Sequence, residues 1–266
     1  MSGLPAFDEQ GQGATAVLLL HGVGGGRAIW GDAASGTTRA IANAGYRAVA
    51  LDLPGYGDSA AMGAPDLAAL VGGVHELIDS LAASRVVLLG HSMGGMVAQE
   101  LMAQSAYAID GLILACTSAS FGKADGAWQA QFVAERLAPL DAGLGMAGMA
   151  DSLVPGLVSP QAPAAALRIA RDIMARVPES TYRSALAAIA GFDRREALAA
   201  IDVPTLLLAA EHDRAAPPEV MQRMAARIAG AEFVCLSSAG HIANVEAPVA
   251  FNAAVVSFLQ RHFPPA

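Results

Sequence analysis

The sequence predicts an α/β fold with a mostly parallel central sheet, helices on both faces and an inserted helical cap. Three observations predict it. Short apolar runs alternate with helical segments from residue 16 to about residue 118, and again from about residue 205. Between these stretches the strand-like runs stop, and only helical periodicity remains. A Gly-x-Ser-x-Gly sequence at residues 90–94 stands where a strand gives way to a helix. Strands that alternate with helices favour a parallel sheet, because right-handed crossovers place the helices on both faces.

The elements follow from local composition and spacing. Short runs rich in leucine and β-branched residues predict strands at 16–20, 47–51, 86–89, 112–116, 205–209 and 232–236. Longer runs with helical spacing predict a helix that ends near residue 44 after a glycine loop, and helices at 67–80, 95–102, 219–228 and 248–258.

Residues 119–200 are expected to form the helical cap, and residues 1–118 and 201–266 the α/β core. Helical spacing is found at 128–137, 164–177 and 181–190, with prolines between these segments. The region follows the carboxyl end of a strand, which is where ligands bind in open α/β sheets. We therefore favour a cap with apolar side chains facing a substrate over a helical layer that only packs.

Composition excludes several classes of function. The chain has 266 residues, of which 54% are hydrophobic, but no apolar stretch reaches the roughly 18 residues of a membrane span. A net charge of −8 without a cluster of basic residues argues against nucleic-acid binding. The N-terminus lacks the basic and apolar segments of a signal peptide, so we expect a cytoplasmic location. Cys116 and Cys235 are expected to be buried free thiols in strands, without the spacing of a metal site.

Ser92 is the expected nucleophile. It lies in Gly90-His91-Ser92-Met93-Gly94, between an apolar run at 85–89 and a helical segment at 95–102. Glycines at these positions allow a tight, strained turn and a close approach of helix to strand, which leaves the serine hydroxyl exposed above the sheet. This nucleophile elbow is favoured over a glycine-rich loop that merely joins a strand to a helix.

A serine hydroxyl is a poor nucleophile at neutral pH, so it needs a base and a group that orients the base. His241 is the expected base, because it follows the strand at 232–236 in a loop of small residues and would emerge at the same sheet edge as Ser92. Among the other downstream histidines, His212 is expected in a loop and His262 in a C-terminal tail.

Asp213 is the expected acid, and Glu211 is the second candidate. Both follow directly on the strand at 205–209. An acidic residue after a strand is often only a turn former. Its position between the serine and the histidine in the chain favours a catalytic role here.

Acyl transfer also needs donors for the oxyanion of the tetrahedral intermediate. The backbone N–H of Met93, directly after the serine, is one expected donor. The other should come from the loop after the first expected strand, residues 21–26, and Val23 is the expected donor there. This glycine run lacks the Gly-Lys-Ser/Thr of a phosphate-binding loop, so we expect no nucleotide site. No cofactor and no metal are expected.

The whole chain, from about Phe7 to Phe263, resembles the α/β-hydrolase superfamily. The motifs that carry the resemblance are His21-Gly22-Val23-Gly24, Asp52-Leu53-Pro54-Gly55-Tyr56-Gly57-Asp58-Ser59, Gly90-His91-Ser92-Met93-Gly94-Gly95 and Gly240-His241. The resemblance implies the same triad and oxyanion donors, and a structural role for Asp52 and Ser59. We expect the first strand of the family's N-terminal hairpin to be absent, because only about fifteen residues precede Ala16.

Within the superfamily the chain is similar to bacterial 3-oxoadipate enol-lactonases and related esterases and lactonases. The similar segments are 93–101, 112–119, Trp128 at the entry to the cap, and 241–246. Gln131 stands where such lactonases tend to carry an arginine. The expected substrate-binding residues are Trp128, Gln131, Phe132, Met146 and Met149.

The function expected from these residues is hydrolysis of a carboxylic ester or lactone through an acyl-serine intermediate. An apolar cap with adaptable methionines favours a small to medium, mostly apolar substrate. Arg136, Arg168 and Arg171 are candidates for holding an anionic group, although charges on such helices are usually solvated. A C–C bond hydrolase or a cofactor-free perhydrolase could use the same triad, and a ligand receptor could retain it without turnover. We expect no nucleic-acid or membrane partner, and we leave a homodimer open.

Overall fold

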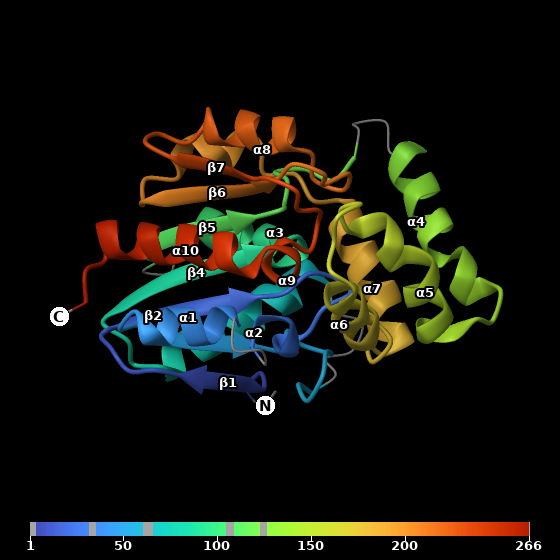
Figure 1. Cartoon of the computed structure of the whole chain (residues 1–266), viewed down its shortest axis with the longest axis horizontal. Coiled ribbons are helices and arrows are strands. Elements are labelled where there is room, and N and C mark those ends of the chain that lie inside the picture. Colours follow the sequence, from blue (N-terminus) through green and yellow to red (C-terminus); the bar gives the residue numbers. More distant parts are fainter. Residues whose placement is uncertain (1–3, 32–35, 61–65, 105–108, 123–126, 266) are drawn as a thin grey trace.

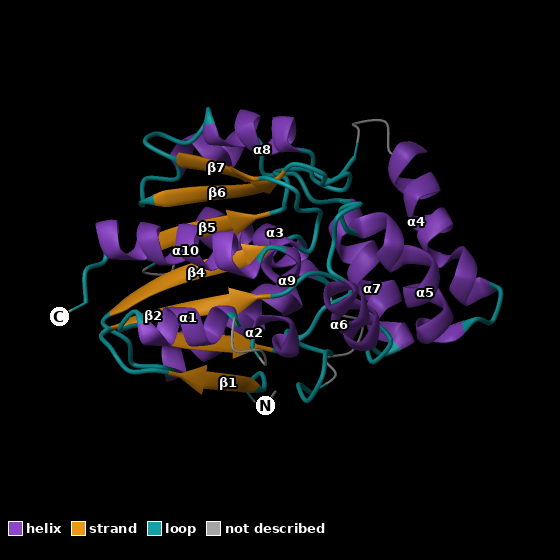
Figure 2. Ribbon diagram, in the orientation of Figure 1, coloured by secondary structure: helices purple, strands orange, loops and turns teal. Residues whose placement is uncertain are grey.

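A seven-stranded sheet forms the centre of the computed structural model, which describes residues 4–31, 36–60, 66–104, 109–122 and 127–265. The strand order is β1-β3-β2-β4-β5-β6-β7 (Figures 1 and 2). The strands are β1 (Phe7–Gln10), β2 (Thr15–Leu20), β3 (Arg47–Leu51), β4 (Arg85–His91), β5 (Gly111–Ala115), β6 (Thr205–Ala210) and β7 (Glu232–Leu236). Only β1, at one edge, is antiparallel to its neighbour β3. The predicted α/β class with a mostly parallel sheet is confirmed.

Helices cover both faces of this sheet, because alternate side chains of each strand point to opposite sides. In β2, Val17 and Leu19 pack in the core on one side of the sheet, whereas Leu18 and Leu20 pack in the core on the other side. Because both faces of the sheet are buried, the strands are continuous apolar runs in the sequence. The helices around the sheet are α1 (Thr37–Asn43), α2 (Leu67–Ser80), α3 (Met93–Ala103), α8 (Pro218–Ala225), α9 (Ala243–Glu246) and α10 (Pro248–His262), with the short 3-10 helices η1 (Arg27–Trp30) and η2 (Glu196–Ala200).

Among the described residues between β5 and β6 there are four α-helices, which we call the helical insertion. They are α4 (Ala127–Asp141), α5 (Gly145–Leu157), α6 (Ala164–Met174) and α7 (Glu179–Ala190). Figure 1 shows them on the side toward which the arrowheads of the parallel strands point. The insertion therefore lies over the carboxyl ends of the strands, where the side chains of a site would gather.

Neither β1 nor α5 was expected from the sequence, and the short helices η1, η2 and α9 were not expected either. The side chains of β1 are mostly exposed, so the strand has no buried apolar run by which it could be predicted. Its pairing with β3 holds it in the sheet. The helix α5 contains Pro155 and begins at Gly145, both of which are poor helix formers. Its buried face packs into the main core and stabilises the helix despite this composition.

The structure also locates His262, the two cysteines and the helix expected to end near residue 44. His262 is not in a tail, since it ends α10 and hydrogen-bonds to Glu232 at 2.7 Å. Cys116 is a buried free thiol as predicted, but Cys235 is exposed, because one face of β7 is only partly covered. The helix expected to end near residue 44 is α1, which ends at Asn43. In the part of the chain that is described, no helix has the length and apolar character needed to cross a bilayer.

Candidate active site

Ser92 lies at the turn between β4 and α3 and has an unusual backbone conformation. Its φ of 54° and ψ of −119° are strained for a residue with a side chain. Glycine is required on both sides: a Cβ at Gly90 would overlap the backbone of Gly94, and one at Gly94 would overlap the carbonyl of Leu20 in β2. The sharp turn thus depends on the two glycines that define the predicted motif.

A chain of hydrogen bonds joins Ser92, His241 and Asp213. The Oγ of Ser92 lies 3.0 Å from Nε2 of His241, and Nδ1 of His241 lies 2.9 Å from Oδ2 of Asp213. Asp213 lies in the loop after β6 and His241 in the loop after β7, so all three residues follow the carboxyl ends of strands. The Asp213 side chain is fully buried and that of His241 is 10% exposed. In this arrangement the imidazole can take the serine proton while the carboxylate fixes its tautomer.

The environment of Asp213 keeps it ionised. Burial by itself would raise the pKa of this carboxyl, but the charge and hydrogen bond of His241, together with the amides of Ala216 and Ala215, lower it overall. Those two amides donate to Oδ1 at 2.9 and 2.8 Å. Glu211, the second candidate, is exposed and accepts a hydrogen bond from the amide of Ser238. The geometry therefore brings Asp213, and not Glu211, to the histidine.

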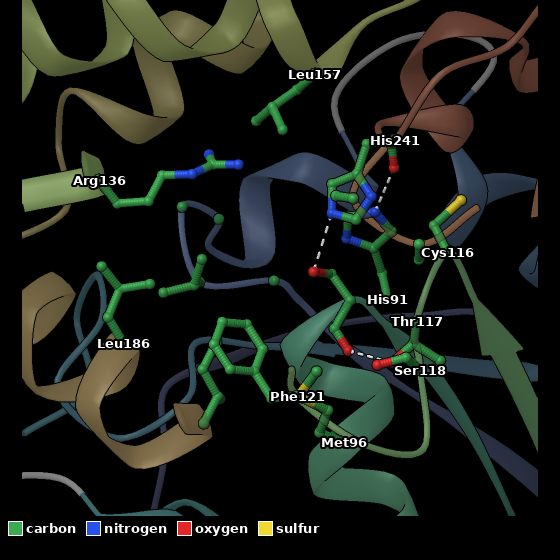
Figure 3. Close-up of a pocket in the computed structure, with 18 of the residues that line it drawn as sticks. His91, Met96, Cys116, Thr117, Ser118, Phe121, Arg136, Leu157, Leu186 and His241 are labelled. Carbon is green, nitrogen blue, oxygen red and sulfur yellow. Dashed lines mark hydrogen bonds between the residues drawn. The ribbon is translucent and has the colours of Figure 1, made fainter. Parts of the chain in front are cut away.

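The backbone of His241 is held from two directions. Its N–H donates to the carbonyl of Leu157 at the end of α5, at 2.7 Å. Its carbonyl accepts a hydrogen bond from Nε2 of His91, also at 2.7 Å (Figure 3). The histidine is thereby tied both to the helical insertion and to the last residue of β4.

Glu246 adds a buried carboxylate to this loop. It accepts hydrogen bonds from the amides of Gly240 at 2.9 Å and Ile242 at 3.1 Å, on either side of His241. It also accepts one from the amide of Ser159, in the segment that follows α5, at 2.7 Å. One side chain therefore fixes the His241 loop and the end of α5 relative to each other.

The two expected oxyanion donors lie close to Ser92. Met93 is the first residue of α3, and the first N–H groups of a helix have no partner within the helix. Val23 lines the same cavity as Ser92, and among the described residues its amide has no hydrogen-bond partner. The Tyr56 hydroxyl donates to the carbonyl of Val23 at 3.0 Å and so helps to fix this loop.

The other residues of the first two motifs hold the backbone. Nδ1 of His21 donates to the carbonyl of Gly22 at 2.8 Å, and its Nε2 accepts from the amide of Leu53 at 3.0 Å. The Ser59 hydroxyl donates to the carbonyl of Asp52 at 2.6 Å. These contacts fit the structural role that the resemblance implies for Asp52 and Ser59.

A cavity of about 170 Å³ lies between Ser92 and the helical insertion. Its lining is mostly apolar and includes Phe121, Trp128, Leu153, Met174, Leu186 and Ile189. The expected residues Trp128 and Phe132 are in the wall, and their rings stack on each other with centroids 5.0 Å apart.

Three expected substrate-binding residues lie elsewhere. Gln131 is exposed on α4 and donates to Glu135 at 2.8 Å. Met146 and Met149 are buried on the face of α5 that packs into the main core, whereas Leu153 and Leu157 of the same helix reach the cavity. Which apolar residues reach the cavity depends on the face that each helix turns toward it, and composition alone does not show which face that is.

Arg136 also lines the cavity, and its spacing from Trp128 and Phe132 in the sequence could have indicated this. Trp128, Phe132 and Arg136 are spaced four residues apart on α4, so they share one face of the helix. The Arg136 guanidinium lies over the Phe132 ring, 4.7 Å from its centroid. Among the described residues there is no group of three or more His, Cys, Asp or Glu side chains that could hold a metal ion.

Fold and site together define a hydrolase of the α/β class. Comparison with known proteins identifies the family to which the chain belongs. Residues 17–254 match the model of the alpha/beta hydrolase family, so the chain belongs to that family. It is 32% identical over 254 residues, 92% of each chain, to a Variovorax paradoxus protein provisionally named as the carbamate hydrolase RutD.

Solved structures of similar proteins include two enzymes with assigned activities. A thermophilic esterase from Thermogutta terrifontis, solved with malate bound, superposes with a TM-score of 0.85 and 28% identity, over 97% of this chain and 93% of that one. The enol-lactonase from Burkholderia xenovorans LB400 gives a TM-score of 0.82 and 29% identity, over 96% of both chains.

Proposed function

We propose that the protein is a serine hydrolase that cleaves a carboxylic ester or lactone through an acyl-serine intermediate. The observation that carries this proposal is the hydrogen-bonded chain from Ser92 through His241 to Asp213, which opens onto a mostly apolar cavity. The similarity to an esterase and an enol-lactonase supports the same type of reaction.

In the proposed mechanism Asp213 holds the Nδ1–H of His241, so that Nε2 accepts the proton of Ser92 as its Oγ attacks the carbonyl carbon. The oxyanion is bound by the amides of Val23 and Met93. His241 then gives the proton to the leaving alcohol oxygen as the ester C–O bond breaks. A water molecule, deprotonated by His241, releases the acid and restores Ser92.

The cavity wall supports a small to medium substrate that is largely apolar. Aromatic and aliphatic side chains from all four inserted helices line the cavity that contains Ser92, and burying apolar substrate surface there contributes about 25 cal/mol per Å². In this proposal the helical insertion is the cap predicted for residues 119–200, and it determines which esters fit.

The test compares wild type with Ser92→Ala and, as a matched control, Ser118→Ala, at a second serine among the residues that line the cavity. With p-nitrophenyl butyrate, Ser92→Ala should lower kcat at least about 1000-fold and abolish labelling by a fluorophosphonate. Ser118→Ala should keep both, and both variants should melt close to the wild-type temperature.

A stoichiometric burst without further turnover in the wild type would contradict the enzyme and favour a receptor. Labelling that persists in Ser92→Ala would contradict Ser92 as the nucleophile. Comparing kcat/KM for aryl esters, lactones, an enol-lactone, a vinylogous diketone and a carbamate would then define the scissile bond.

A further inference from the structure

The guanidinium of Arg136 points into the cavity. Figure 3 shows it extending from α4 toward the centre of the cavity, from the side opposite His241. Among the described residues that line the cavity none is an Asp or a Glu. A positive charge therefore faces a largely apolar space at a distance from the hydrogen-bonded chain.

The other arginines of the helical insertion are in different surroundings. Arg171 pairs with Asp151, and Arg183 pairs with Asp141 at 2.8 Å. Arg168 is exposed to water. Arg136 is partly buried, and no carboxylate of the described residues lies within 4.0 Å of it, although the chain carries 24 acidic residues.

Burial disfavours the charged form of Arg136. Loss of hydration lowers the pKa of its guanidinium, and the nearby Tyr182 and Glu135 offset this only in part. Buried charges in proteins are normally paired, because an unpaired one loses its hydration without compensation. The Phe132 ring covers one face of the guanidinium and leaves its N–H edge available to a partner.

Tyr182 provides a second polar group in the same part of the cavity wall. Its ring is buried, and burial raises the pKa of its hydroxyl to about 12, while the positive charge of Arg136 opposes the rise. The phenol therefore keeps its proton at neutral pH and can donate a hydrogen bond to an anion next to the guanidinium.

We propose that Arg136, assisted by the Tyr182 hydroxyl, binds a carboxylate at the end of the substrate that is remote from the scissile carbonyl. The planar guanidinium presents two parallel N–H donors, which match the two oxygens of a carboxylate. This rests on the proposed function and narrows it, since the substrate becomes a monoester or lactone that carries a free carboxylate beyond an apolar spacer.

The kinetic test uses pairs of esters that differ only in charge. Monomethyl adipate carries the carboxylate, and in methyl 6-methylheptanoate an uncharged isopropyl group replaces it. Monomethyl glutarate and monomethyl pimelate vary the spacer. Arg136→Met should lower kcat/KM for the best monoester about 10- to 100-fold, as expected for loss of a charge-assisted hydrogen bond, and change that for the neutral ester less than threefold. Arg168→Met, on the exposed face of the insertion, is the matched control and should change neither.

Two more conservative variants separate a loss of carboxylate binding from a loss of folding. Tyr182→Phe removes only the hydroxyl and should selectively lower kcat/KM for the monoester, by about 3- to 10-fold. Arg136→Lys keeps the charge and should lie between wild type and Arg136→Met. Equal losses for charged and neutral esters, or no loss for either, would overturn the carboxylate site.

A binding measurement separates this inference from the proposed function. In Ser92→Ala protein, which should not turn over, calorimetry should detect monomethyl adipate or one of its homologues binding at least 10-fold more tightly than in Ser92→Ala/Arg136→Met. If wild type hydrolyses no ester but this difference is found, the proposed function fails and the carboxylate site stands. If the neutral ester is hydrolysed and no difference is found, the carboxylate site fails and the hydrolase stands.

Discussion

At the scale of single residues, two carboxylates that follow the same strand have different surroundings. Asp213 is buried against His241 and accepts two backbone amides, whereas Glu211 is exposed and only caps the turn at Ser238. Only two positions separate them in the sequence. Burial, together with the hydrogen bond to the imidazole, selects Asp213 as the group that can hold the tautomer of His241.

Replacing Asp213 by Asn should therefore lower kcat by about 10⁴-fold, the loss known when the equivalent carboxylate of a serine protease is replaced. The amide would present the wrong group to Nδ1 and favour the tautomer in which Nε2 carries the proton. Glu211→Gln is the matched control and should change kcat less than threefold. Steady-state hydrolysis of p-nitrophenyl butyrate measures both, and a large loss in Glu211→Gln alone would show that the acid has been misassigned.

Sequence reasoning found the residues of the hydrogen-bonded chain more readily than those of the cavity wall. The chemistry of acyl transfer restricts Ser92, His241 and Asp213 in residue type and in chain order, so few alternatives remain. A wall position depends instead on how a helix is turned about its axis. Met149 and Leu153 of α5 are equally apolar, yet only Leu153 reaches the cavity.

At the scale of elements, the close approach of α3 to β2 and β4 positions Ser92. Gly94 lies directly against the carbonyl of Leu20, and the start of α3 has no room for a side chain there. Gly72, in the middle of α2, is different, because a Cβ at this position would meet nothing within 4 Å. The same substitution should therefore have opposite effects at the two glycines.

Gly94→Ala should lower the free energy of unfolding by about 1–3 kcal/mol, because helix and strand must separate to admit the methyl group. Gly72→Ala should raise it by roughly 0.5–1 kcal/mol, because alanine loses less backbone entropy in a helix. Urea unfolding of both variants measures these changes. Similar stabilisation in both variants would show that helix propensity, and not the contact with Leu20, controls the effect at Gly94.

The elements predicted well are those whose apolar residues keep the spacing of a strand or of a helix along their length. The bounds of β3, β7 and α2 match the predicted ones, and β2 and β6 differ by one residue at one end. The strand β1 could not be predicted from the sequence, because it pairs with β3 without burying an apolar run. Tertiary packing overrides local propensity in α5, where Pro155 and Gly145 argue against a helix.

At the scale of the whole molecule, two buried histidines link folding to pH. Burial lowers the pKa of His21 to about 4 and that of His91 to about 4, even though His21 donates to a carbonyl and His91 does the same. In the unfolded chain both return to about 6.5. Between these values the unfolded state binds more protons than the folded state, so acid favours unfolding.

The stability that comes from keeping these histidines neutral is fully present above about pH 6.5 and is lost as the pH falls toward 4. Each group should contribute a slope of up to roughly 1.4 kcal/mol per pH unit in that window, and the lowered pKa of Asp213 adds its effect only at still lower pH. Urea unfolding at half-unit steps from pH 7.5 to 4 measures the slope. His21→Asn, which keeps a donor toward Gly22, and His91→Gln, which keeps one toward His241, should each remove about half of it. A slope that neither variant reduces would assign the acid sensitivity to the surface carboxylates instead.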